Sequence, residues 1–227
     1  MGLVERLFAW TGGALFVASL ALTVWWYAFG LGRTAPSSGW GALAFDAGLF
    51  TVFALHHSLF AREPIKDAMA RMMAGRMVRP IYVWTASILL ILVCLLWRPV
   101  GGELYHATGS AAIPFVAAQL AGLLLTAAAV RLIDALELAG IHQPSESDAL
   151  QIRGPYRLVR HPVYLGWMLM VFGAAHMTGD RLAFAGISSA YLLIAIPFEE
   201  RSLERRLGPA YRTYKELVSA RVVPYVF

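Results

Sequence analysis

Long apolar runs alternate with short polar segments along the whole chain. A helix needs about 20 apolar residues to cross a hydrocarbon layer of roughly 30 Å, and several runs approach that length. They cover residues 7–30, 39–60, 80–97, 112–134, 162–178 and 182–198. The last two are short and nearly continuous, so they predict two tilted spans or a short hairpin that does not fully cross. We therefore predict an all-α, polytopic integral membrane protein with about six transmembrane helices.

Two polar segments carry a helical pattern of their own. Residues 61–79 mix basic side chains with isoleucine and methionine, which favours an amphipathic helix at the membrane interface over a plain loop. Residues 199–218 place apolar side chains every three or four positions among charges, which predicts a cytosolic C-terminal helix. Gly208 and Pro209 are expected to kink this helix.

The composition excludes a soluble domain. Hydrophobic residues make up 59% of the chain and charged residues 15%, whereas soluble proteins contain roughly 45–50% and about 25% respectively. The single cysteine, Cys94, lies within an apolar run, which excludes disulfides and cysteine-based metal sites. The first apolar run is too long for a signal peptide core, so we expect it to be retained as a span.

The positive charges predict how the chain is oriented. Its net charge is +5, with nineteen lysines and arginines, but these residues lie between the apolar runs and form no basic patch for nucleic acid. Sixteen of them fall on one predicted face, and only Arg33, Arg98 and Arg181 fall on the other. Cytoplasmic loops are rich in lysine and arginine, so we expect a bacterial inner membrane protein whose two termini and active site are cytoplasmic.

The longest non-apolar stretch, GIHQPSESDALQIRGPYRLVRHP over residues 140–162, lies on that face. Arg157, Arg160 and His161 gather at the start of the fifth apolar run, where the helix dipole opposes positive charge, and this arrangement calls for an anionic partner. The alternative is that the arginines are orientation anchors and that the histidine caps the helix. Glu199 and Glu200, at the end of the sixth run, could hold a cationic ligand, or they could be solvated and paired with neighbouring arginines.

Two motifs together suggest a family. The segment GPYRLVRHPVYLG, followed by PFEERSLERRLGPAYRTYKELV, resembles the C-terminal signature of the isoprenylcysteine carboxyl methyltransferase and phospholipid methyltransferase superfamily of membrane enzymes. Upstream, FALHHSLFAREPIK and a Trp-Arg-Pro turn at residues 97–99 are similar to the methanethiol S-methyltransferase and NnrU-like branch. One difference is that residues 133–142 read IDALELAGIH, where that branch has a more aromatic segment.

The resemblance implies S-adenosylmethionine as methyl donor and S-adenosylhomocysteine as product. It divides residues 1–227, a single transmembrane domain, into N-terminal spans (1–138) and a donor-binding catalytic region (139–227). No Gly-x-Gly-x-x-Gly segment follows a strand, so a dinucleotide-type fold is not expected. By resemblance, the donor site takes the following residues: Gln143, Tyr156, His161, Pro162, Tyr164, Gly166, Glu199 and Glu200.

Methyl transfer to a thiol also needs a base, and intramembrane histidines are usually functional. His56 and His57 are the candidate bases, and Arg160 completes the expected catalytic set. The implied acceptor is a small thiol such as methanethiol, which would yield dimethyl sulfide. The alternatives are an amphiphilic acceptor, such as a prenylcysteine carboxylate or a lipid, and a transporter or accessory protein with a polar pathway through the histidines and Asp46.

Membrane lipids are the remaining expected partners, and nucleic acid is not expected. We otherwise expect Asp46 to be a packing or pairing residue. No metal is expected, because His56 and His57 point to diverging helix faces and no third ligand occurs at a suitable spacing.

Overall fold

The computed structural model describes residues 2–36, 38–60, 62–132, 141, 150 and 152–224. The chain divides into two compact units. The first unit contains Met1–Gly102 and Ala135–Ser145, and the second contains Glu103–Asp134 and Glu146–Phe227. We describe each unit by itself.

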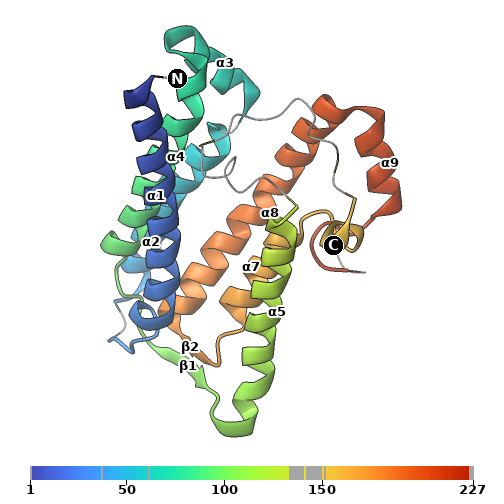
Figure 1. The fold of residues 1–227 in the computed structure, drawn as a ribbon. Coiled ribbons are helices and arrows are strands. Elements are labelled where there is room, and N and C mark those ends of the chain that lie inside the picture. The colour runs from blue at the N-terminus through green and yellow to red at the C-terminus, as the bar shows by residue number, and fades with distance from the viewer. Residues whose placement is uncertain are drawn as a thin grey trace. The chain divides into compact units, whose positions relative to one another are not determined.

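The first unit is built around helix α4 (Figure 1). Its elements are α1 (Leu3–Trp25, continued by a π-helical turn, Trp26–Gly30), α2 (Trp40–Leu59), α3 (Glu63–Met72) and α4 (Gly75–Leu96). A Cβ at Gly12 of α1 would lie 2.7 Å from the Trp84 ring of α4. The missing side chain therefore lets the indole approach α1, where its nitrogen donates to the Phe8 carbonyl at 3.0 Å.

The Trp-Arg-Pro turn closes the far end of α4. Asp46 of α2 is fully buried, and its Oδ1 accepts a hydrogen bond of 2.9 Å from the Arg98 backbone nitrogen. The Arg98 guanidinium lies 3.7 Å from the centre of the Phe45 ring. Asp46 thus ties α2 to this turn, which confirms the pairing role expected for it.

The described residues of the second unit form two long helices, two short helices and a small sheet. In chain order they are β1 (Glu103–His106), a 3-10 turn (Gly109–Ala112), α5 (Ile113–Val130), a 3-10 turn (Gly154–Arg157), α7 (Pro162–Phe172), β2 (His176–Thr178), α8 (Gly179–Leu207) and α9 (Pro209–Leu217). Strands β1 and β2 pair antiparallel and form the one sheet of the described residues. This two-stranded sheet is a small departure from the all-α expectation.

Helices α5 and α7 run antiparallel. Gln119 donates from its amide nitrogen to the Met170 carbonyl at 3.0 Å, and the Ala107 nitrogen donates to the Ala175 carbonyl at 2.8 Å. The chain thus returns through α7 to the level at which α5 begins, and it reverses again into α8.

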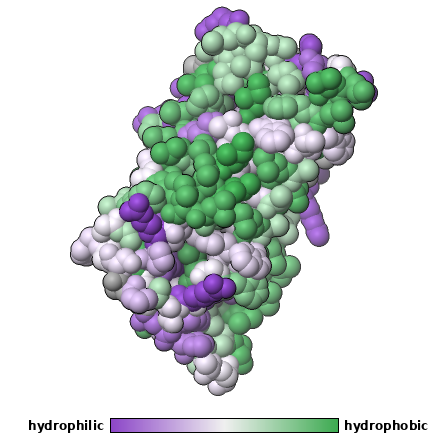
Figure 2. Space-filling model, turned by 90° about the vertical axis from the view of Figure 1, so that its left-hand side faces the viewer, coloured by the Kyte–Doolittle hydropathy of each residue, from purple (hydrophilic) through white to green (hydrophobic). Residues whose placement is uncertain are grey.

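Five helices of the described residues are long and apolar enough to cross a membrane. They cover Leu3–Gly30, Trp40–Leu59, Gly75–Leu96, Gly109–Val130 and Gly179–Leu207. Large apolar side chains lie exposed on them, and apolar surface covers much of the face in Figure 2, as expected for contact with lipid. The described residues therefore form an all-α, polytopic integral membrane protein apart from the two-stranded sheet.

The fifth apolar run is the least accurate part of the sequence prediction. Helix α7 ends at Phe172 and not near residue 178, and its 11 residues extend only about 16 Å. Gly173 and strand β2 complete the return of the chain instead. In contrast, the break predicted at residues 208–209 is confirmed, because α8 ends at Leu207, Gly208 takes a φ of 56° and Pro209 begins α9.

Candidate functional site

A backbone pairing fixes the segment that precedes α7. The Arg160 nitrogen donates to the Ala220 carbonyl at 3.0 Å, and the His161 nitrogen donates to the Arg221 carbonyl at 2.8 Å. Pro162 then opens the helix, where its missing N–H has no cost. The C-terminal segment therefore holds the arginine and the histidine of the RHP motif in place.

The Arg160 side chain is buried, and three acceptors surround it. Its Nε donates to Glu200 Oε1 at 2.7 Å, and its Nη1 donates to the carbonyls of Val218 and Ser219, both at 2.7 Å. Arg160 and Glu200 are only 9% and 7% exposed. A buried ion pair of this kind ties α7, α8 and the C-terminal segment together.

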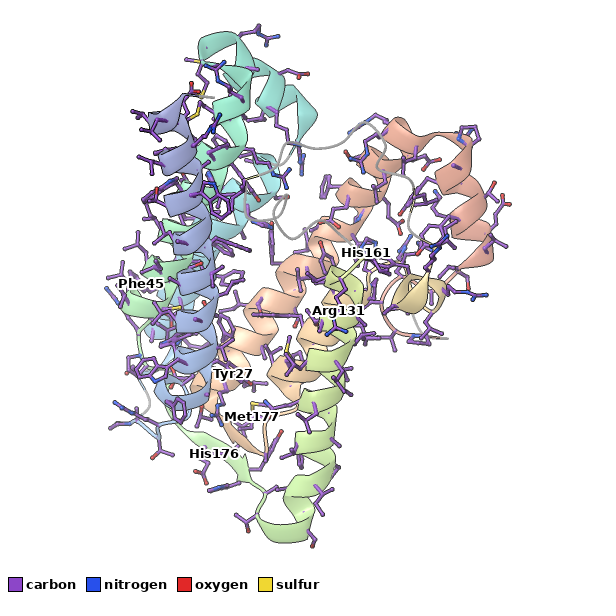
Figure 3. The ribbon with its side chains drawn as sticks, in the orientation of Figure 1. Tyr27, Phe45, Arg131, His161, His176 and Met177 are labelled. Carbon is purple, nitrogen blue, oxygen red and sulfur yellow. The ribbon has the colours of Figure 1, made fainter. Side chains whose placement is uncertain are left out.

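His161, labelled in Figure 3, lies between two adjacent carboxylates of α8, those of Glu199 and Glu200. Its Nδ1 is 3.6 Å from Glu199 Oε2, and its Nε2 is 3.5 Å from Glu200 Oε1. Both distances are too long for a good hydrogen bond, and the buried Nε2 makes none within the described chain. Since a buried nitrogen without a hydrogen bond is costly, this atom is suited to meet a ligand.

Tyr164 connects the histidine to Glu199. Its ring stacks on the His161 ring with centroids 5.2 Å apart, and its hydroxyl donates to Glu199 Oε1. The Glu199 side chain is 47% exposed, against 9% for Glu200. The adjacent carboxylates therefore differ: Glu200 is a buried scaffold residue and Glu199 faces accessible space.

Three tyrosines flank this cluster on the side of α9. The Tyr214 hydroxyl donates to the Tyr156 carbonyl at 2.7 Å, and Tyr211 and Tyr214 are almost completely buried. Burial raises the pKa of Tyr214 to about 12, although the positive charge of Arg160 opposes the rise. Burial likewise raises the pKa of Tyr156 and of Tyr211, so these phenols stay neutral at physiological pH.

The structure brings most of the predicted site residues of the second unit together. Arg160, His161, Tyr164, Glu199 and Glu200 form one connected cluster, which we call the RHP–EE cluster, and Pro162 and Tyr156 lie beside it in the chain. Within the described residues, Glu199 and Glu200 form no ion pair with Arg201 or Arg205. This differs from the alternative that the two glutamates pair with neighbouring arginines. Gln143 lies outside the described residues.

Gly166 lies where two helices of the second unit approach closely. A Cβ at this position would lie 2.2 Å from Thr126 Oγ1 and 2.8 Å from the Gly122 carbonyl. The close approach that this glycine permits in the structure is that of α5, and its expected place in the donor site stays a prediction.

Several contributors escaped the sequence analysis. The carbonyls of Val218 and Ser219 accept from Arg160, and Arg221 Nε lies 3.7 Å from Glu200 Oε2. Backbone carbonyl acceptors cannot be identified from residue types, because every residue has one. The Arg221 side chain could have been considered from the sequence, because it is a charged residue in the C-terminal segment.

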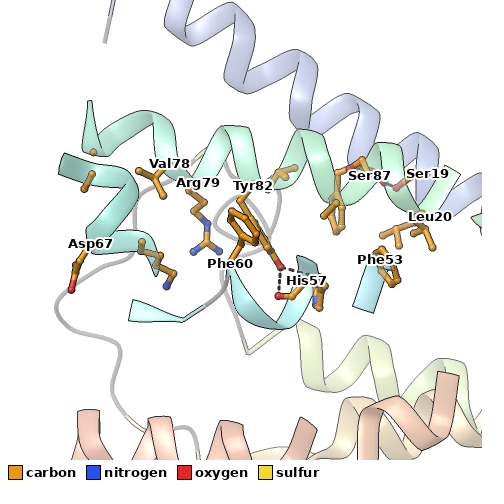
Figure 4. A pocket seen from close by; sticks show the side chains of 17 residues that line it. Ser19, Leu20, Phe53, His57, Phe60, Asp67, Val78, Arg79, Tyr82 and Ser87 are labelled. Carbon is orange, nitrogen blue, oxygen red and sulfur yellow. Dashed lines mark hydrogen bonds between the residues drawn. The ribbon is translucent and has the colours of Figure 1, made fainter. Parts of the chain in front are cut away.

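The first unit contains a cavity of about 470 Å³ among α1, α2, α3 and α4 (Figure 4). Phe53, Leu20 and Val83 are among its apolar lining residues, whereas Lys66, Asp67 and Arg79 give it a charged end. A volume of this size falls within the range of roughly 300–1,000 Å³ that is common for small-molecule sites.

His57 lines this cavity and His56 does not. The His57 Nδ1 lies 2.8 Å from the Tyr82 hydroxyl, which also approaches the His57 carbonyl at 3.3 Å. The His56 ring stacks on Phe60 at 4.6 Å, and its buried Nδ1 has no hydrogen bond within the described chain. The adjacent histidines thus have different surroundings, as their diverging helix faces predict.

Comparison with known proteins agrees with the motifs. Residues 112–210 match the phospholipid methyltransferase family. Methanethiol S-methyltransferase 2 of Bradyrhizobium diazoefficiens is 31% identical over 201 residues, which are 85% of this chain and 77% of that protein. Methanethiol S-methyltransferase of Crocosphaera subtropica is 32% identical over 82% of this chain and 76% of its own.

More distant relatives also match. Nurim of Sus scrofa is 29% identical over 71% of this chain and 68% of its own. No solved structure matches the chain significantly. The family match covers α5, α7 and α8 and includes every residue of the RHP–EE cluster. The chain therefore belongs to the isoprenylcysteine carboxyl methyltransferase and phospholipid methyltransferase superfamily, and it is a membrane methyltransferase.

Proposed function

We propose that the protein transfers a methyl group from S-adenosylmethionine to a small thiol, with the donor held at the RHP–EE cluster. The observation that carries this proposal is the paired environment of Glu199 and His161. One offers an accessible carboxylate and the other a buried nitrogen without a hydrogen bond. The residues present thus fit a ligand with both a cationic and a hydrogen-bonding group.

The roles of these residues follow from their contacts. Glu199 would pair with the amino group of the donor, and Tyr164, which donates to Glu199, would fix the orientation of this carboxylate. The stacked rings of His161 and Tyr164 offer an aromatic face to a sulfonium or an adenine. Arg160 and Glu200 neutralise each other, so we assign them as positioning residues that hold His161 in place.

The bound donor supplies an electrophilic methyl group on a sulfonium. Transfer requires the acceptor sulfur to be aligned about 3–3.5 Å from that carbon, with water excluded. We propose His57 as the base that takes the thiol proton, supported by its place in the first-unit cavity and its contact with Tyr82. His56 remains the second candidate base.

Methanethiol is the acceptor that we favour, because it is named for two relatives that match most of this chain. Incubation of the purified protein with S-adenosylmethionine and methanethiol is expected to yield dimethyl sulfide and S-adenosylhomocysteine. Equal product formation by a His57→Ala variant would overturn the role of that base. Absence of dimethyl sulfide with the wild-type protein would overturn the acceptor.

One observation favours a second acceptor class. The cavity that His57 lines measures about 470 Å³ and combines apolar walls with a charged end. A two-heavy-atom thiol fills little of that volume, whereas a prenylcysteine carboxylate or another amphiphile would fill it. Methyl transfer to such an amphiphile, without dimethyl sulfide formation, would select this alternative.

Donor binding can be tested separately from the acceptor. Glu199→Gln and Tyr164→Phe are expected to weaken S-adenosylhomocysteine binding about tenfold or more, a loss of about 1.4 kcal/mol. His161→Ala should lower activity without unfolding the protein. Glu216→Gln, an exposed carboxylate on α9, is the matched control. Unchanged affinity in both site variants, measured by calorimetry, would defeat the assignment of this site.

The charge pattern supports an orientation for the donor site. We propose that both termini and the RHP–EE cluster face the cytoplasm of a bacterial inner membrane, because sixteen of the nineteen basic residues lie on that predicted side. A cysteine introduced beside the cluster should react with a membrane-impermeant thiol reagent only in inverted vesicles. Labelling in intact cells would contradict this orientation.

A further inference from the structure

The β1–β2 sheet brings together three side chains of the kinds that bind metals. His106 pairs with His176 across the two strands, and their rings stack with centroids 4.3 Å apart. Glu103 Oε2 lies 2.8 Å from His176 Nε2. One potential ligand atom from each of the three lies within 4.8 Å of the other two, the one such group found among the described residues.

The strand that carries His176 is firmly anchored. The neighbouring Met177 and Thr178 are buried, at 2% and 0% exposure. The Arg181 guanidinium donates to the His176 carbonyl, and the Arg181 nitrogen donates to Thr178 Oγ1 at 3.1 Å. His176 is therefore presented from a fixed backbone toward the partly exposed His106 and Glu103 side chains, as a pre-organised binding site requires.

We propose that Glu103, His106 and His176 form a binding site for a divalent transition metal, with Zn²⁺ as the best match. Two imidazoles and one carboxylate are a ligand set that zinc takes in proteins, with a fourth position for water. Zinc holds such ligands about 2.0–2.1 Å away, which places them about 3.4 Å apart at tetrahedral angles. The three potential ligand atoms lie within 4.8 Å of one another, so metal binding would draw the most distant pair together by up to about 1.4 Å.

This site is distinct from the proposed donor site. Helix α8 begins at Gly179, directly after β2. Glu200 of the RHP–EE cluster lies 21 positions further along the same helix. At 1.5 Å per residue, that path is about 31 Å long, which equals the thickness of a hydrocarbon layer. The metal would thus lie at the opposite membrane face from methyl transfer and would clip together the strands that lead into α5 and α8.

Metal binding can be measured without any enzyme assay. The full-length protein, purified without a histidine tag and stripped of metal, is titrated with Co²⁺, whose visible absorption reports tetrahedral nitrogen and oxygen ligands. We expect one equivalent to bind to the wild-type protein. His106→Ala and His176→Ala should each weaken binding at least tenfold, and Glu103→Gln should weaken it as well. Leu104→Ala, on the same strand, should bind like the wild-type protein.

Thermal unfolding provides a second readout. Added Zn²⁺ should raise the unfolding temperature of the wild-type and Leu104→Ala proteins but not that of the histidine variants, because a ligand stabilises only the state that binds it. Similar unfolding temperatures of all variants without metal would show that they fold. A wild-type protein without the Co²⁺ absorption, or histidine variants that bind as tightly, would overturn the proposal.

Discussion

The second unit contains two groups of histidine and carboxylate side chains at opposite ends of α8. At one end, Glu200 is 7% exposed and is neutralised by Arg160, while His161 lies between two carboxylates. At the other end, Glu103 and His106 are exposed, and Glu103 Oε2 lies 2.8 Å from His176 Nε2. The same residue types therefore serve different chemistry: a buried guanidinium creates a rigid polar scaffold, whereas histidines without one are suited to a cation.

The buried group should be the more sensitive to the loss of one charge. Arg160→Met removes the buried cation that pairs with Glu200 and leaves the half-exposed Arg221, at 3.7 Å, as the remaining arginine beside this carboxylate. Removing one partner of a buried pair costs about 3–5 kcal/mol, and this value is the upper limit here. Denaturant unfolding in detergent, followed by tryptophan fluorescence, measures the free energy of unfolding. Arg157→Met, which changes an exposed arginine of the same segment, should have little effect. Equal losses in both variants would remove the contrast between scaffold and surface.

The close contact between α5 and α7 provides a second test of packing in the second unit. Gly166→Ala forces a methyl group against Thr126 and Gly122 of α5, and overpacking of this kind costs about 1–3 kcal/mol. In Gly186→Ala the new methyl group meets nothing within 4 Å, so the gain in helix propensity should stabilise the protein by up to about 1 kcal/mol. Opposite signs in the same unfolding assay are expected. A stabilised Gly166→Ala variant would contradict the close contact of α5 and α7.

The tyrosines beside the RHP–EE cluster add a dependence on alkaline pH. The pKa of Tyr214 is about 12 in the folded protein, against about 10 for an ordinary phenol. The folded state therefore keeps this proton longer, so the contribution of Tyr214 to stability is complete below pH 10 and is lost as the pH rises toward 12. Tyr214→Phe should lose about 0.5–1.5 kcal/mol at pH 8 with its hydrogen bond.

The Tyr214→Phe variant should also show a flatter decline than the wild-type protein between pH 10 and 12. Tyr105→Phe, on the exposed β1 strand, is the control and should follow the wild-type curve. Parallel declines in the wild-type and Tyr214→Phe proteins would contradict the raised pKa.

The smallest effect on the free energy of unfolding is expected for the β1–β2 sheet in the metal-free protein. Glu103→Gln removes an exposed contact with His176, and exposed ion pairs contribute no more than about 1 kcal/mol. The unfolding free energy of the metal-free variant should thus stay close to that of the wild-type protein. A loss as large as that of Arg160→Met would show that the two groups are equally structural, and the comparison would fail.

The amino-acid sequence alone determines a large part of this fold. Apolar runs of about 20 residues have few stable options outside a membrane-spanning helix, so the spans could be predicted from length and hydropathy. The helix break at Gly208 and Pro209 was equally predictable, because glycine tolerates a positive φ and proline begins a helix but rarely continues one. The RHP and EER motifs likewise contain most residues of the candidate donor site.

Other features depend on contacts between residues far apart in the chain. The sequence pattern cannot show that Glu200 pairs with Arg160 while Glu199 accepts from Tyr164, because adjacent helix positions look alike until their neighbours are known. The close approach of α5 to Gly166 is likewise not visible in the local sequence. The end of α7 was misplaced because apolar residues continue into the loop and β2.

The proposed metal site shows the same limit most clearly. Glu103 and His106 lie three residues apart, but His176 follows 70 residues later, so no local spacing indicated a third ligand and no metal was expected from the sequence. Strand pairing brings the two histidines together. Hydropathy and backbone chemistry act locally and can be inferred from the sequence, whereas the partners of each polar group are decided by tertiary packing, which alone sets their burial and distances.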